Sequence, residues 1–263
     1  MNKILAIANQ KGGVGKTTTC INLGASLALA DKRVLLVDMD PQGNLTSGVG
    51  LRDAATQVPT VYQSLTAATP GSVPLTVLDT AIQGLKLAPA DRHLTGAEIE
   101  LVALDRRESR LRTLLEPLRH EFDVILIDSP PSLGLLTLNA LVAADAVLIP
   151  LHCEYFALEG LAELVATMRR VRSAFNPDLG VAGVLLTMHD ERTNLGQQVA
   201  RDVRGFFEER VFRTVIPRNV RLGEAPSHGM PVILYDAKSK GAEAYVTLAR
   251  ELLSRELVAL AEP

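Results

Sequence analysis

Short apolar segments alternate along the chain with longer segments of helical periodicity. Five of the apolar runs are continuous, without the polar alternation expected of a half-exposed strand. Continuous runs rich in β-branched and aliphatic residues indicate strands that are covered on both faces, as in a parallel sheet. The predicted strands are residues 4–8, 34–37, 124–127, 146–151 and 181–186.

Helical patterns fall between these runs, so strands and helices alternate along the chain. This alternation predicts an α/β fold with a mostly parallel, twisted sheet and helices on both faces. Residues 51–90 contain four of the prolines and are interpreted as excursions at the sheet edge. The predicted helices are residues 16–30, 97–118, 135–143, 158–175, 196–209 and 241–260.

Composition indicates a folded chain in a reducing compartment, and the length allows one large domain or two small ones. Of the 263 residues, 47% are hydrophobic and 22% are charged, which excludes a mainly disordered chain. The only cysteines, Cys20 and Cys153, exclude a disulfide framework. The longest apolar stretch, residues 133–151, contains Asp145 and is interpreted as a buried helix followed by a buried strand rather than a membrane span.

A glycine-rich loop follows the first predicted strand and leads directly into a predicted helix. Its glycines allow backbone N–H groups to surround phosphate oxygens, and the helix N-terminus adds positive potential. In such a loop Lys16 reaches the β- and γ-phosphates of a nucleotide, and the Thr17 hydroxyl binds Mg²⁺. The predicted nucleotide-binding residues here are Lys11, Gly12, Gly13, Val14, Gly15, Lys16, Thr17 and Thr18.

The front of this loop departs from the standard phosphate loop, because Lys11 and Gly12 stand where a glycine is usual. A second lysine so close to the phosphates is chemically unusual, and from its own loop Lys11 points awkwardly. We therefore consider Lys11 a candidate to cross a dimer interface and neutralise the nucleotide of a partner copy, as an arginine finger does.

Carboxylates follow two of the predicted strands. Asp40 lies past the second strand, near the expected γ-phosphate, and is suited to hold Mg²⁺ through water or to orient an attacking water. The alternative for Asp40, and more so for Asp38, is a turn or capping residue. Asp128 ends a strand, the usual position of a Mg²⁺-holding carboxylate in phosphate-loop proteins. The predicted metal site is Thr17, Asp40 and Asp128, and the predicted catalytic residues are Lys11, Lys16 and Asp40.

Late in the chain, Pro217 is a candidate to stack on adenine and Asn219 to bind its edge, although spacing alone indicates only a turn. The formal net charge of −3 hides a basic window over residues 192–221, where seven arginines accompany three acidic residues. Such a window is either a solvated helix face or a surface for DNA phosphates, and few aromatic residues interrupt it, which disfavours single-strand stacking. Arg218 and, beyond the window, Lys238 and Lys240 are candidate phosphate contacts.

Taken together, these motifs resemble those of the small chromosomal ParA/Soj partition ATPases, which share a deviant phosphate loop with MinD and the nitrogenase iron protein. The resemblance spans nearly the whole chain and implies one ATPase domain over residues 1–263. It also implies a cytoplasmic, nucleoid-associated protein that binds ATP and Mg²⁺, forms an ATP-bound sandwich dimer and holds double-stranded DNA without sequence preference. A ParB-type centromere-binding partner is expected to stimulate a slow intrinsic hydrolysis of ATP. The matching segments are residues 9–19, 37–50, 127–141, 150–161, 186–195 and 216–229.

The resemblance also implies roles for individual residues. Lys11 is similar to the lysine that acts across the dimer, and Gly12 to the small residue needed where two loops meet. Asp40 resembles the carboxylate that promotes hydrolysis, and Asp128 the second carboxylate of the metal shell. The DNA-contacting arginines of the family correspond to Arg192 and Arg221.

Alternatives within and outside the family make different predictions. The phosphate loop begins at residue 11, so no N-terminal helix-turn-helix domain is expected. A MinD-type membrane tail is disfavoured, because the apolar stripe of residues 241–260 has few basic residues beside it and is expected to pack on the sheet. An iron–sulfur protein is disfavoured by the helical position of Cys20. A metabolic ligase or kinase and a pure nucleotide sensor remain the other interpretations of the same loop.

Overall fold

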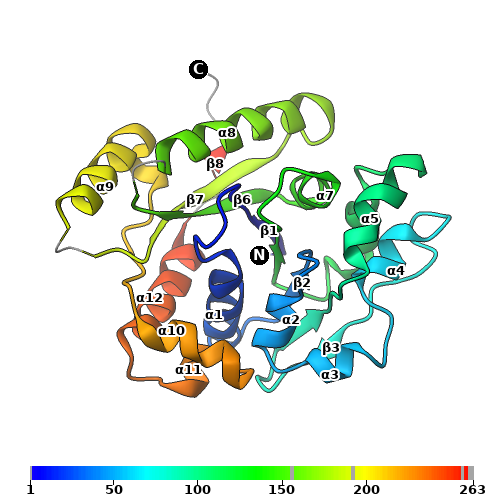
Figure 1. The fold of residues 1–263 in the computed structure, drawn as a ribbon, viewed down its shortest axis with the longest axis horizontal. Coiled ribbons are helices and arrows are strands. Elements are labelled where there is room, and N and C mark those ends of the chain that lie inside the picture. Colours follow the sequence, from blue (N-terminus) through cyan, green and yellow to red (C-terminus); the bar gives the residue numbers. More distant parts are fainter. Residues whose placement is uncertain (1, 155–156, 191–192, 256–257, 260–263) are drawn as a thin grey trace.

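The computed structural model describes residues 2–154, 157–190, 193–255 and 258–259. Within these residues an eight-stranded sheet has the order β3-β4-β2-β5-β1-β6-β7-β8 (Figure 1). The six inner strands are parallel, and only the short edge strands β3 and β8 are antiparallel to their neighbours, which confirms the predicted fold class. The strands are β1 (Lys3–Ile7), β2 (Val34–Asp38), β3 (Leu78–Asp79), β4 (Leu85–Ala88), β5 (Val124–Asp128), β6 (Ala146–His152), β7 (Gly180–Thr187) and β8 (Val258–Ala259).

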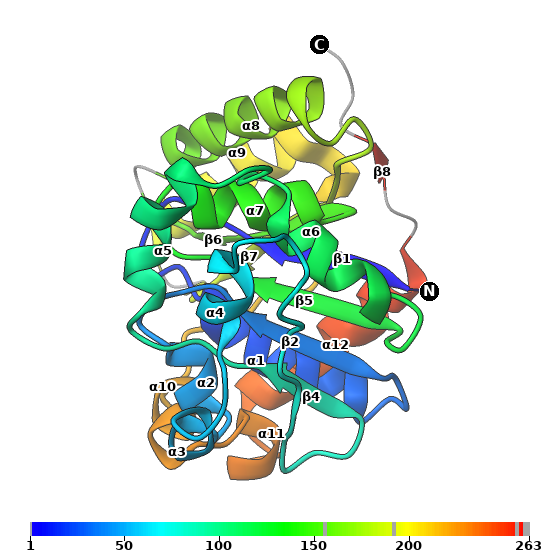
Figure 2. The ribbon, with the colours of Figure 1, turned by 90° about the vertical axis from the view of Figure 1, so that its right-hand side faces the viewer.

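Helices cover both faces of the sheet. Figure 2 shows α1 and α12 on one side of the strands and α6, α7, α8 and α9 on the other. The helices are α1 (Lys16–Ala28), α2 (Asn44–Gly48), α3 (Arg52–Ala55), α4 (Val61–Thr66), α5 (Leu94–Glu100), α6 (Arg110–Leu115), α7 (Leu135–Ala143), α8 (Ala157–Ala174), α9 (Asn194–Phe207), α10 (Val220–Glu224), α11 (Val232–Tyr235) and α12 (Lys240–Ser254). The 3₁₀ turns are η1 (Leu101–Ala103), η2 (Glu116–Leu118), η3 (Glu208–Arg210) and η4 (Ala225–His228).

Alternate residues of each inner strand enter two separate hydrophobic cores. In β1, Ile4 and Ala6 join the core that contains α7 and α8, whereas Leu5 and Ile7 join the core that contains α1 and α12. Because successive side chains of a strand point to opposite faces, two covered faces require apolar residues at every position. This explains why the strands read as continuous apolar runs.

The predicted helix over residues 97–118 is wrong, because this segment is broken into α5, η1, α6 and η2. At the break Arg106 adopts a left-handed φ of 52°. Downstream, the buried side chain of Arg110 turns inward and donates hydrogen bonds to the carbonyl oxygens of Asp105 and Leu65, at 3.0 and 2.9 Å. A buried guanidinium group must donate hydrogen bonds to acceptors of this kind. Arg110 could not reach both of these carbonyl oxygens if residues 97–118 formed one straight helix.

Residues 51–90 do form excursions at the sheet edge, as predicted, but they also contain strand β4, which pairs in parallel with β2. At the other end of the chain, the last helix ends at Ser254 rather than at residue 260. The predicted residues 256–257 and 260 lie outside the described part of the chain.

The apolar stripe of α12 faces inward. Leu248, Ala249 and Leu252 are buried in the core shared with α1, and the Tyr245 hydroxyl lies 3.2 Å from the Thr19 hydroxyl of α1. The described part of the apolar stripe therefore packs against the core of its own chain, as the sequence predicts. Among the described helices, none is both long enough and apolar enough to cross a membrane.

Candidate nucleotide-binding site

The loops that carry the predicted site residues leave the sheet side by side. Strand β5 lies between β1 and β2, and all three are parallel, so the segments after Ile7, Asp38 and Asp128 emerge at the same edge. Ligands of open α/β sheets bind beyond the carboxyl ends of such strands. A cavity of about 570 Å³ lies there. The predicted residues that line it are Gly12, Gly13, Gly15, Lys16, Thr17, Thr18, Asp40, Pro217, Arg218 and Asn219.

The glycine-rich loop takes a shape that other residues do not readily adopt. Gly13 and Gly15 have φ values of 72° and 87°, in the left-handed region that favours glycine. Gly15 precedes α1 without a side-chain cap, so the first N–H groups of the helix are available to an anionic ligand. The Thr187 hydroxyl donates to the Val14 carbonyl oxygen at 2.8 Å and ties the loop to β7. Val14 itself is buried and supports the loop rather than lining the cavity.

The two lysines of the loop point to different places. Lys16 lines the cavity, and its Nζ donates to the Lys11 carbonyl oxygen at 3.1 Å. Burial lowers the pKa of Lys16, and the negative charges of Asp128 and Asp40 oppose that shift. The Lys11 side chain does not line the cavity and instead forms an ion pair with Glu154. In the single chain, the Lys11 side chain therefore lies outside the cavity that Lys16 lines.

Asp38 and Asp40 make different contacts although they lie two residues apart. Asp38 is fully buried and accepts hydrogen bonds from the Asp40 N–H at 3.1 Å and from the Thr46 N–H and hydroxyl at 2.9 and 2.7 Å. Burial raises the pKa of Asp38 to about 6. Asp40 lines the cavity, while its Oδ1 accepts from the Gln42 N–H at 2.9 Å. Asp40 therefore forms a turn and still faces the site, whereas Asp38 holds α2 against the end of β2.

Asp128 is buried, and its carboxylate oxygens have Thr17 and Cys20 as neighbours but make no well-formed hydrogen bond within the described structure. The adjacent Ser129 hydroxyl, also buried, lacks one too. Burial and then the charge of Asp38 raise the pKa of Asp128 well above its usual range, with Thr17 and Lys16 acting in the opposite direction. Buried polar atoms without partners are rare and point to an absent ligand. Carboxylate and hydroxyl oxygens suit Mg²⁺, which binds to one or two carboxylates together with phosphates and water.

This donor set fits a metal held jointly with a nucleotide. Among the described residues, no group of three or more His, Cys, Asp or Glu side chains could hold a metal ion. Thr17, Asp40 and Asp128 would therefore depend on phosphate oxygens and water to complete a Mg²⁺ shell.

The far wall of the cavity is formed by the segment before α10. The Asn219 Oδ1 accepts from the Arg221 N–H at 2.9 Å and caps α10, which leaves the Asn219 amide NH₂ for a base edge. Backbone bonds from His189 to Ile216, at 3.0 Å, and from Arg218 to His189, at 3.2 Å, fix this segment beside β7. The lining residues that sequence reasoning did not assign to the site include Met188, Leu222 and Tyr245, which belong to no motif.

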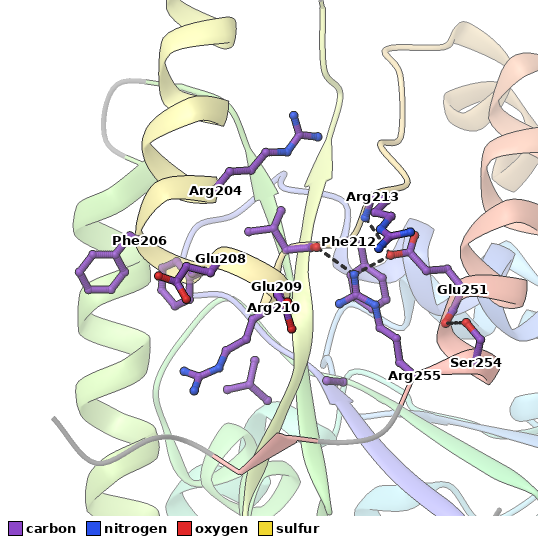
Figure 3. A pocket seen from close by; sticks show the side chains of 14 residues that line it. Arg204, Phe206, Glu208, Glu209, Arg210, Phe212, Arg213, Glu251, Ser254 and Arg255 are labelled. Carbon is purple, nitrogen blue, oxygen red and sulfur yellow. Dashed lines mark hydrogen bonds and ion pairs between the residues drawn. The ribbon is translucent and has the colours of Figure 1, made fainter.

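The arginine-rich window does not form one surface. Arg204, Arg210 and Arg213 line a second cavity of about 1270 Å³, between α9, β7 and α12 (Figure 3). In that cavity the Arg255 guanidinium lies 4.2 Å from the centre of the Phe212 ring and is paired with Glu251 (Figure 3). Figure 1 shows α9 and α10 on separate parts of the molecule. Of the predicted phosphate contacts, Arg218 and Arg221 belong to the part of the window around α10.

Around α10 the basic residues are accompanied by acids. Arg218 is exposed and lines the nucleotide cavity. Arg221 forms ion pairs with Glu224, at 2.8 Å, and with Asp236, at 3.3 Å, which links α10 to the segment that precedes α12. Two further predicted residues, Lys238 and Lys240, are exposed at the start of α12. Arg192 lies outside the described residues.

Comparison with known proteins identifies the family. Residues 2–181 match the family model described as an AAA domain. The chain is 56% identical over 257 residues to the chromosome partitioning protein ParA of Myxococcus xanthus, covering 97% of this chain and 89% of that protein. It is also 56% identical over 252 residues to the sporulation initiation inhibitor protein Soj of Bacillus subtilis, covering 96% and 98%. The chain belongs to the ParA/Soj family.

Solved structures share the fold. A Mycobacterium smegmatis structure titled cobyrinic acid a,c-diamide synthase with bound ADP and magnesium has a TM-score of 0.82 and 41% identity, covering 96% of this chain and 94% of that chain. The cell division ATPase MinD of Pyrococcus furiosus has a TM-score of 0.76 and 25% identity, covering 96% and 99%. Proteins named for different functions therefore share this architecture.

The unpartnered Asp128 carboxylate predicts an unusual pH dependence of stability. Without Mg²⁺ and nucleotide, Asp128→Asn is expected to raise the unfolding midpoint at pH 8, because a neutral amide removes the cost of burying a carboxyl group whose pKa is raised. A folded-state pKa above the unfolded value means that ionisation costs stability as the pH rises. The gain should therefore shrink as the pH is lowered toward 4, measured by thermal unfolding followed by circular dichroism.

Asp123→Asn provides a control of opposite sign. Its hydrogen bond from Arg33 lowers the pKa of Asp123 to about 2, so its ionised form stabilises the folded chain above the unfolded pKa. Removal of that charge should lower the midpoint at pH 8. An Asp128→Asn chain that is less stable than the wild type at pH 8 would contradict the assignment of Asp128 as a carboxylate that lacks its cation.

Proposed function

We propose that this protein is a cytoplasmic, nucleoid-associated ATPase that partitions chromosomal or plasmid DNA through an ATP-dependent dimer. The observation that carries the proposal is the divergence of the two loop lysines: Lys16 faces the nucleotide cavity and Lys11 does not. The names of the relatives from M. xanthus and B. subtilis support the partition role. The ADP and magnesium in the M. smegmatis structure support ATP, ADP and Mg²⁺ as the ligands of this cavity.

The residues that line the cavity, and the buried Asp128, which does not line it, each have a proposed task. The N–H groups of the loop and the Lys16 ammonium neutralise the nucleotide phosphates, with Thr18 at the loop end. Thr17, Asp40 and Asp128 would hold Mg²⁺, which supplies further charge neutralisation at the phosphates. Asp40 is also placed to orient the attacking water.

Intrinsic hydrolysis is expected to be slow. Among the described residues that line the cavity, Asp40 is the only carboxylate, and its Oδ1 is engaged by the Gln42 N–H. A general base works best with a pKa near the operating pH and free access to the proton it removes. A ParB-type centromere-binding partner would then accelerate hydrolysis by completing or reshaping the site, and so release the DNA.

In this proposal, a second copy of the chain supplies the Lys11 amine that the nucleotide does not receive from its own chain. A Cβ atom added at Gly12 meets nothing within 4 Å, and Gly12 is not among the glycines with positive φ. The folded monomer therefore does not require glycine at this position. A closely apposed second loop would require it, and would bring the Lys11 of each copy to the phosphates of the other.

DNA binding follows from the dimer in this proposal. Pairing brings the basic residues around α10 and at the start of α12 of both copies onto one surface. Each of the two surfaces alone binds DNA only weakly. Arginine and lysine contacts to phosphates give affinity without sequence preference. The residues proposed to contact DNA are Arg192, Arg218, Arg221, Lys238 and Lys240.

Gly12→Val tests the dimer interface. The variant is expected to fold and bind ADP as the wild type does, because the monomer has space for the side chain. With Mg²⁺ and a non-hydrolysable ATP analogue it should remain monomeric in sedimentation velocity runs. A Gly12→Val chain that still pairs with the analogue would rule out close contact between the two loops.

The double variant Arg218→Ala with Arg221→Ala tests the DNA surface. Affinity for a random duplex in the presence of the ATP analogue should fall, and the slope of log affinity against log salt should decrease by about 0.9 for each DNA phosphate that is no longer neutralised. Fluorescence anisotropy over a salt series measures both quantities. Arg169→Ala with Arg170→Ala, two exposed changes on α8, is the matched control, and an unchanged slope in the Arg218 and Arg221 double variant would refute the surface.

A metabolic ligase is the second candidate, favoured by the 41% identity to the M. smegmatis protein named cobyrinic acid a,c-diamide synthase. It predicts ATP turnover that depends on a small carboxylic acid and an amine donor, and that proceeds at equal rates with and without DNA. Turnover that responds to DNA and a partition partner, and not to such small molecules, would exclude it.

A further inference from the structure

The ion pair between Lys11 and Glu154 joins two segments that are distant in sequence. Glu154 follows β6 and accepts a hydrogen bond from the Lys11 Nζ. The side chains are 37% and 47% exposed, so both remain accessible to a second molecule. Neither residue lines the nucleotide cavity. The pair therefore lies beside the site, at the surface where a second copy would approach.

The surrounding contacts hold Lys11 toward Glu154. Strands β1 and β6 are parallel neighbours, and the Asn9 Nδ2 donates to the Pro150 carbonyl oxygen at 2.7 Å. The Asn9 Oδ1 in turn accepts from the Lys11 N–H at 3.0 Å. The front of the loop is thus tied to the end of β6, from which Glu154 extends.

Both oxygens of Glu154 are engaged. Oε2 accepts from Lys11, and Oε1 lies 3.0 Å from the His152 Nδ1. The hydrogen bond from Lys11 lowers the pKa of Glu154, which keeps the carboxylate ionised. Because two neighbours fix the Glu154 carboxylate, its ion pair with Lys11 is a well-defined contact of the single chain rather than a transient one.

We propose that Glu154 is a positioning residue that holds Lys11 in the single chain and sets the concentration at which ATP-bound copies pair. The inference rests on the proposed function, in which Lys11 acts on the nucleotide of a partner. Lys11 must leave Glu154 before its amine can reach phosphates in another copy. Each dimer breaks two such pairs, so the ion pair opposes premature pairing.

Glu154→Gln tests the inference by removing the charge and keeping the shape. Each partly exposed ion pair contributes modestly, so two released pairs should tighten the dimer dissociation constant by about 3-fold to 25-fold. Sedimentation velocity with Mg²⁺ and a non-hydrolysable ATP analogue measures this constant. ADP affinity should not change, because Glu154 does not line the cavity. Glu163→Gln, an exposed change of equal charge on α8, should have no effect.

A second readout reports the ion pair itself. The rate at which acetic anhydride modifies the Lys11 amine, followed by mass spectrometry without nucleotide, should rise in Glu154→Gln relative to Lys238 in the same sample. Glu154→Asp keeps the charge on a shorter side chain and should shift both readouts less, in the same direction. In a Lys11→Gln background, Glu154→Gln should no longer alter the dimer constant.

The outcomes separate this inference from the proposed function. A wild-type chain that never pairs with the ATP analogue overturns the proposed function and this inference with it. A wild-type chain that pairs, but is not tightened by Glu154→Gln, overturns the inference alone. A gain that persists in the Lys11→Gln background also overturns it, because Glu154 would then act independently of Lys11.

Discussion

The parallel pairing of β5 with both β1 and β2 is the constraint on which the site depends. It aligns Ile7, Asp38 and Asp128 at one edge of the sheet, so the phosphate loop and two acidic segments leave the sheet together. Side chains on both faces of these strands are buried in two cores, which leaves little freedom for a shift in register. A slip of one residue would move Asp128 out of the site and place a polar group in a core.

The same alignment places buried charges close together. Lys16, Asp38 and Asp128 are buried beside one another, and only Asp38 has a full set of hydrogen bonds within the protein. An unpartnered buried carboxylate costs stability, and retention of such a group is typical of functional sites. The free chain therefore carries a strain that nucleotide and Mg²⁺ are suited to relieve, which couples ligand binding to stability.

Sequence reasoning succeeded where local pattern decides the structure. Continuous apolar runs predicted the inner strands, and the glycine spacing located the cavity that Lys16 and Asp40 line. It failed at residues 97–118, where apolar periodicity continues but the burial of Arg110 against distant carbonyl oxygens breaks the helix. Strand β4 was missed because its four residues, with a partly exposed Lys86 between leucines, resemble a loop as much as a strand.

Long-range pairs account for the other differences. The position of Asp40 past the strand end favoured it over Asp38 as a site residue. The hydrogen bonds from Thr46 that occupy Asp38 could not be predicted, because they depend on how α2 folds back. The acids that accompany Arg221 include Asp236, fifteen residues later in the chain, so a count of charges along the sequence overstates the free positive charge near α10. The ion pair between Lys11 and Glu154 joins residues 143 positions apart in the sequence, and no sequence motif predicts it.

In the proposed cycle, ATP creates a DNA-binding dimer from chains that bind DNA weakly alone. Sedimentation velocity of a fluorescent random duplex, mixed with the protein and detected through the DNA, tests this step without assuming which residues carry it. The three conditions are no nucleotide, ADP with Mg²⁺, and a non-hydrolysable ATP analogue with Mg²⁺. Only the analogue is expected to shift the duplex to a faster species that carries chains in pairs. Equal shifts in all three conditions, or a complex with one chain per duplex, would contradict the ATP-dependent dimer.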